Sequence, residues 1–171
     1  MARTRTFRID GDLDDAIQQL AEKERSSVSA LVNKALQRYV DWDRANATRG
    51  MVSVPAKVLN RLMSERTPEE SRKLGRWAGS QLFIPNMRAQ YATVTTEIAV
   101  RGISMLSSYG GRFEFDHKLT GRTHVILIRH SLGPNWSSYY AGTLESIFGD
   151  FLKKKLKMRV TGELCICQFE D

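Results

Sequence analysis

The first forty residues carry two kinds of hydrophobic pattern, one alternating and one helical. Residues 4–9 alternate, so Phe7 and Ile9 lie on one side of an extended chain and polar side chains lie on the other. From residue 13 the apolar positions recur three or four apart, as on one face of a helix. The two helical faces comprise Leu13, Ile17, Leu20 and Ala21, then Leu31, Val32, Ala35, Leu36 and Tyr39. The pattern predicts a strand followed by two helices.

This predicted unit is too small to be stable alone. A single short strand has no pairing partner, and two short helices enclose too little apolar surface. A second copy of the chain solves both problems, because two strands can pair antiparallel about a two-fold axis above four helices. The paired ribbon then displays Thr4, Thr6 and Arg8 of each copy on one exposed face. Such a ribbon fits the DNA major groove, where Arg and Thr side chains bond to base edges.

The stretch resembles the ribbon-helix-helix DNA-binding fold of the Arc/MetJ/CopG class, over about the first quarter of the chain. The resemblance rests on the strand at residues 6–9, the first helical face, and a second helix that begins after Ser27, a favourable N-cap. It implies an intertwined homodimer, or a higher oligomer, bound to double-stranded DNA. It also implies that bases are contacted by Thr4, Thr6 and Arg8, and phosphates by Arg3, Ser27 and Val28.

In that class a glycine often stands just before the second helix. Here Glu24-Arg25-Ser26 occupies that turn. The alternative is that residues 4–39 are an ordinary β-α-α segment of a larger fold and that Arg8 is a solvated surface charge.

Composition indicates a basic globular protein, whose surplus positive charge either attracts phosphates or forms a solvated face. The chain has 171 residues, is 42% hydrophobic and has a net charge of +7. Arg3, Arg5 and Arg8 precede the first acid. No apolar run approaches the ~20 residues of a membrane span, and no apolar signal segment begins the chain. Cys165-Ile166-Cys167 does not resemble a secreted disulfide framework. We therefore expect a cytoplasmic, nucleoid-associated protein without a membrane partner.

The segment between residues 43 and 50 is polar and small and has no apolar stripe. It predicts a linker at residues 45–53 between a DNA-binding and dimerisation domain, residues 1–44, and a C-terminal domain, residues 54–171.

The C-terminal domain is predicted to be α+β, with helices followed by a β-β-α-β order. Start signals predict helices at Val54-Pro55 and Thr67-Pro68, the latter broken at Pro85, and apolar spacing predicts another from about residue 94 to Gly110-Gly111. Two strands, at residues 112–119 and 122–129, then flank a two-residue turn at Thr120-Gly121. A long helix from Gly133 places a lysine run at residues 153–157 in its last turn, and one strand at residues 159–169 ends the chain.

The predicted hairpin suggests a metal site. Its register places His117 opposite His124, about 5 Å apart between Cβ atoms, with His130 further along the same face. Cys165 and Cys167 share one face of the last strand. Imidazole and thiolate ligands suit zinc, nickel or copper. Some ribbon-helix-helix regulators are nickel-responsive, but their ligand spacing does not occur here. The alternative is that the histidines border a hydrophobic face and the cysteines are core residues.

Other candidate chemistry is sparse. The aromatic side of the long helix (Trp136, Tyr139, Tyr140, Phe148) lines either a small-molecule effector pocket or plain core. The lysine run either solubilises a helix end or contacts DNA beside the operator. Glu97, Glu114, Asp116 and Glu145 have no evident partner, and no phosphate-binding loop, nucleophile elbow or zinc-protease motif occurs. We therefore do not expect an enzyme.

The sequence predicts a DNA-binding transcriptional regulator whose C-terminal domain oligomerises or senses a ligand. Two alternatives stay open. One is an antitoxin of the same DNA-binding class, which normally has a short C-terminal part that is disordered until it binds its toxin. The other is an architectural protein that coats DNA without sequence choice.

Overall fold

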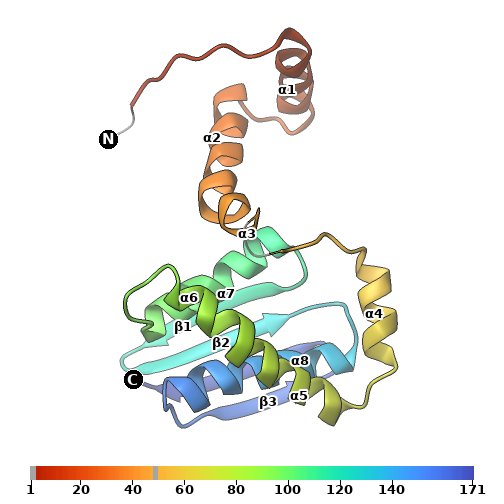
Figure 1. Cartoon of the computed structure of the whole chain (residues 1–171), viewed down its shortest axis with the longest axis vertical. Coiled ribbons are helices and arrows are strands. Elements are labelled where there is room, and N and C mark those ends of the chain that lie inside the picture. Colours follow the sequence, from red (N-terminus) through yellow and green to blue (C-terminus); the bar gives the residue numbers. More distant parts are fainter. Residues whose placement is uncertain (1–2, 48–49) are drawn as a thin grey trace. The chain divides into compact units, whose positions relative to one another are not determined.

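A computed structural model describes residues 3–47 and 50–171 (Figure 1). The chain divides between Met51 and Val52 into two compact units, each described by itself below. This division lies within the segment, residues 45–53, that the sequence predicts as a linker.

The N-terminal unit is helical. Its elements are α1 (Gly11–Lys23), α2 (Val28–Arg38), the π-helical turn η1 (Tyr39–Asp43) and α3 (Arg44–Ala47). Both predicted helices are present, and Ser27 caps α2 by accepting a hydrogen bond from the Ala30 N–H at 3.1 Å. The predicted strand is absent, because residues 3–10 form no ladder in this single chain. A strand needs a neighbour to bond its N–H and C=O groups, and the described part of this unit contains no second strand.

The C-terminal unit begins with a series of helices. They are α4 (Ala56–Ser64), α5 (Pro68–Ala78), the π-helical turn η2 (Gly79–Phe83), α6 (Ile84–Arg88) and α7 (Thr96–Gly110). Thr67 and Glu70 form a reciprocal capping box at the start of α5. The predicted break at Pro85 is wrong: Pro85 lies in the first turn of α6, where its missing N–H is tolerated after the π-helical turn.

A four-stranded antiparallel sheet follows, in the order β1-β2-β4-β3. Its elements are β1 (Glu114–Thr120), β2 (Thr123–Arg129), α8 (Pro134–Leu144), the π-helical turn η3 (Glu145–Phe151), β3 (Lys157–Thr161) and β4 (Leu164–Glu170). The unit is therefore α+β as predicted. The single predicted last strand is instead the hairpin β3–β4, because Gly162, at positive φ, reverses the chain.

The turn between β1 and β2 also differs from the prediction by one position. Its two loop residues are Gly121 and Arg122, and Thr120 pairs with Thr123. Gly121 has a φ of +60°, which glycine adopts without strain at the first position of a tight hairpin turn. His117 consequently pairs with Ile126, whereas the predicted partner was His124.

The helices of this unit cover one face of the sheet. Helix α8 packs on β3 and β4, α7 packs on β1, and α5 packs across α8 (Figure 1). The buried core between the sheet and α8 includes Ile126, Ile128, Leu144, Ile147 and Phe148. Alternate residues of each strand face away from this core, so the sheet has one packed face and one outer face.

Among the described residues, every helix is too short or too polar to cross a membrane.

Candidate functional site

The segment that precedes α1 displays the residues predicted to contact DNA. Thr4, Thr6 and Arg8 are all exposed, and so is Arg3. Phe7, which the alternating pattern places on the opposite side, is also 56% exposed. In a single chain the apolar surface of this Phe side chain stays in contact with water, which is unfavourable.

The two helices of the N-terminal unit leave most of their apolar faces uncovered. Ala21 is buried, but Leu13, Leu20, Leu36 and Tyr39 are 43–58% exposed. These are the residues that the sequence pattern assigns to a core. Isolated exposed apolar side chains are ordinary, whereas several on the helical faces that the sequence pattern assigns to a core indicate an interaction surface. We call Phe7, Leu13, Leu20, Leu36 and Tyr39 the apolar face.

The start of α2 has the geometry of an anion site. The Ser27 side chain satisfies the Ala30 N–H, and the Ser27 carbonyl accepts from the Leu31 N–H at 3.1 Å. The N–H groups of Val28 and Ser29 precede the first intrahelical hydrogen bond and point out of the helix end. The helix dipole adds positive potential there. Ser27 and Val28 therefore lie where the resemblance places a phosphate contact.

The turn before α2 has a backbone conformation that favours glycine. Arg25 has a φ of +50°, the left-handed region that glycine adopts most readily. The turn thus has the glycine-like conformation although an arginine occupies it, at a cost of about 1–2 kcal/mol.

In the C-terminal unit, His117 and His124 lie on the same face of the sheet, as predicted. Because they are diagonal neighbours, their rings stack with centroids 5.1 Å apart, and His117 Nε2 lies 2.9 Å from His124 Nδ1. His124 Nε2 lies 2.8 Å from a carboxylate oxygen of Asp171. This carboxylate also accepts hydrogen bonds from Lys154 and Thr96.

The side chains of His117, His124 and Asp171 form a continuous hydrogen-bonded network. If His117 Nε2 donates to His124 Nδ1, then His124 Nε2 donates to Asp171. The hydrogen bond from Lys154, followed by that from His124, holds the pKa of Asp171 well below its usual range. Burial, and then the proximity of His124, lower the pKa of His117. The sequence carries no signal for Asp171, because its partners are 17 to 75 residues away.

His130 belongs to a separate buried network. Its Nδ1 accepts from the Leu132 N–H at 3.2 Å, so its Nε2 carries the proton that bonds Ser137 Oγ at 2.9 Å. Ser137 donates in turn to the Gly162 carbonyl at 2.8 Å. These bonds connect the end of β2, helix α8 and the β3–β4 turn, and burial lowers the pKa of His130. His130 therefore helps to hold the end of β2, helix α8 and the β3–β4 turn together.

The two cysteines are core residues. Cys165 and Cys167 are fully buried on the packed face of β4, and burial raises the pKa of each thiol to about 12. Ile126 lies between His117 and Cys167 in the sheet register. Within residues 3–47 and 50–171, no three His, Cys, Asp or Glu side chains gather as a metal-binding group. Within one chain, the structure therefore does not bring the five predicted ligands together.

Glu145 has partners that the sequence does not reveal. It forms ion pairs with Arg72 and with Arg76, the latter at 3.2 Å, and Arg76 also pairs with Asp150 at 2.6 Å. These bonds connect α5 to η3. The predicted aromatic residues of α8 also lie mostly in the core: Trp136, Tyr140 and Phe148 are buried.

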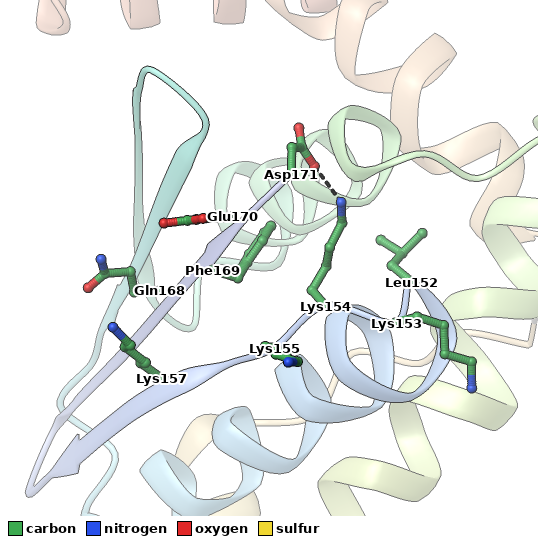
Figure 2. Close-up of a pocket in the computed structure, with 9 residues that line it drawn as sticks. All are labelled: Leu152, Lys153, Lys154, Lys155, Lys157, Gln168, Phe169, Glu170 and Asp171. Atoms are coloured by element: carbon green, nitrogen blue, oxygen red, sulfur yellow. Dashed lines mark hydrogen bonds and ion pairs between the residues drawn. The ribbon is translucent and has the colours of Figure 1, made fainter.

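The lysine run lines a cleft of about 540 Å³ at the end of the sheet (Figure 2). The prediction placed these lysines in the last turn of a helix, and this is wrong. Lys153 has a φ of +59° and ends the helix, so Lys154 and Lys155 follow in extended chain and Lys157 begins β3. Lys154 points to Asp171, whereas Lys153, Lys155 and Lys157 point in different directions.

No protein-family model matches this chain, and neither does any curated protein.

Proposed function

We propose that the protein is a sequence-specific DNA-binding transcriptional regulator, active as a homodimer or a higher oligomer. The observation that carries this proposal is the apolar face of the N-terminal unit, which a single chain leaves in water. Burying a large apolar side chain contributes about 1.5–3 kcal/mol. Five such side chains in each copy supply a strong drive for two copies to associate.

A second copy also gives residues 3–10 the partner they lack. Two extended segments related by a two-fold axis can pair antiparallel, which satisfies their backbone groups and turns Phe7 of each copy inward. Thr4, Thr6 and Arg8 then lie on the outer face of the ribbon. In the major groove, Arg8 bonds guanine and the threonines bond bases or pack against thymine methyl groups.

The phosphate backbone is held beside this ribbon. The N–H groups at the start of α2, near Ser27 and Val28, bond one phosphate, and Arg3 contributes a further charge contact. These contacts set the position of the ribbon in the groove, while the three outward side chains select the sequence.

The C-terminal unit serves oligomerisation or the binding of an effector. Its own large core supports a unit of fixed shape, unlike the short tail of an antitoxin.

Selection of bound sequences from a random duplex pool tests the proposal. We expect a short palindromic or directly repeated site, because two copies present the same residues. Recovery of no preferred sequence would replace the proposal with architectural DNA binding.

Arg8→Ala tests the assigned reader. The variant should lose about 1–3 kcal/mol of specific binding and tolerate more bases at one position of each half-site. Arg101→Ala, an exposed arginine on α7, is the control with the same charge change. Equal operator affinity of the Arg8 variant and the parent would show that Arg8 does not contact a base.

A further inference from the structure

Strand β3 and the segment that leads into it carry three exposed cations. Leu156 and Met158 pack against the core, and Lys155, Lys157 and Arg159 alternate with them along the chain. All three are exposed, and β3 is an edge strand. We call these three side chains the cation row.

The cation row is not neutralised within the described part of the chain. On the neighbouring strand, Lys157 pairs with Gln168 and Arg159 pairs with Ile166, while Glu170, two residues beyond Gln168, lines the same cleft as Lys155 and Lys157. No acid of the described residues lies within ion-pair distance of the three cations. Some other cations of this unit are compensated: Arg72 and Arg76 pair with Glu145.

The geometry of the cation row suits an extended anion. Alternate residues of an extended chain are ~6.6 Å apart, so the backbone positions of the three residues span about 13 Å. A small anion needs donors that converge on one point. Figure 2 shows instead that the side chains of Lys153, Lys155 and Lys157 point apart. Nucleic-acid backbones present one phosphate per ~3.4 Å of each strand along the axis, which matches a line of charges.

We propose that the cation row binds the phosphate backbone of nucleic acid, as a second contact that is independent of sequence. The choice of nucleic acid as the polyanion rests on the DNA-binding function proposed above. The contact adds affinity and salt dependence and leaves the choice of sequence to the N-terminal ribbon.

A structural role for these charges predicts a different result. Lysines on an edge strand prevent pairing with the strands of other molecules. In that case their removal would promote self-association and leave the salt dependence of DNA binding unchanged.

The test measures how the affinity for a random-sequence duplex depends on salt. Each lost phosphate contact reduces the slope of log K against log salt by about 0.9. The variant Lys155→Gln/Lys157→Gln/Arg159→Gln should therefore lose about 2.7 from this slope. The control Lys57→Gln/Arg66→Gln/Arg101→Gln removes the same charge from exposed positions on other elements and should keep the parental slope. Lys155→Arg/Lys157→Arg keeps the charge and should do the same.

The outcomes separate the two proposals. An unchanged slope in the row variant, with a parent that selects a site, overturns the cation row alone. A reduced slope in the row variant, with a parent that prefers no sequence, supports the row and overturns specific regulation. A parent that binds no duplex overturns both. If the triple variant self-associates in sedimentation, the three single variants give the same test, each with a loss of about 0.9.

Discussion

Gly75 on α5 and Gly142 on α8 allow these two helices to approach unusually closely. A Cβ atom on Gly75 would lie 1.9 Å from the Tyr139 carbonyl oxygen, and one on Gly142 would lie 2.0 Å from the Arg72 carbonyl oxygen. In both cases the obstructing atom is backbone, which cannot rotate away as a flexible side chain can. Replacing Gly75 by Ala therefore forces the helices apart.

The magnitude of this effect follows from the distances. Contacts of Cβ atoms below 3.0 Å essentially do not occur, so the helices must separate locally by about 1 Å. A gap of that size removes a quarter to a half of each dispersion contact across the interface. The hydrogen bond from Thr143 Oγ1 to the Gly75 carbonyl, now 3.2 Å, would lengthen and lose ~1 kcal/mol. Alanine favours the helix over glycine by about 1 kcal/mol, which partly offsets these losses. Because of this overpacking, the Gly75→Ala variant should have a free energy of unfolding about 2–3 kcal/mol lower than that of the parent.

Urea unfolding followed by far-UV circular dichroism measures the loss. Gly110→Ala is the matched control, because Gly110 ends α7 and a Cβ there would meet no atom within 4 Å. The control should have the stability of the parent or slightly more. A Gly75→Ala protein as stable as Gly110→Ala would refute the close approach of α5 and α8.

Three further predictions concern the other parts of the chain. Leu36→Asp places a charge in the apolar face and should yield monomers at micromolar concentration in sedimentation, with loss of DNA binding. Arg25→Gly relieves the left-handed turn and should stabilise the N-terminal unit by up to about 1 kcal/mol, measured by hydrogen exchange of α1 and α2. Folding lowers the pKa values of both Asp171 and His117. The free energy of unfolding is therefore highest above the pKa values that these groups have in the unfolded chain, and it decreases as the pH falls through them. Stability should therefore decline below about pH 6.5, the usual histidine value, and His117→Asn should weaken that decline in pH-dependent thermal melts.

Local signals in the sequence determined most helix positions. Ser27 and Thr67 precede helices because each side chain accepts a hydrogen bond from an N–H three residues later, an interaction within one turn. Gly111 ends α7 because it adopts a positive φ without strain. The alternation of Phe115 and His117 with acids and lysine indicated a strand for a similarly local reason. The shared face of His117 and His124 was predictable because a two-residue turn fixes the parity of a hairpin.

Tertiary structure decided what depends on distant residues. The ladder placed the hairpin turn at Gly121-Arg122, one position later than predicted. Asp171 joins His124 because β4 pairs with β2, and Glu145 finds Arg72 because α5 packs on α8. The lysine run leads into the edge strand β3, which begins at Lys157 and pairs with β4, although lysines at the end of a helix are equally favourable locally. Helix starts depend on bonds within one turn, whereas sites depend on packing between segments that only the folded chain brings together.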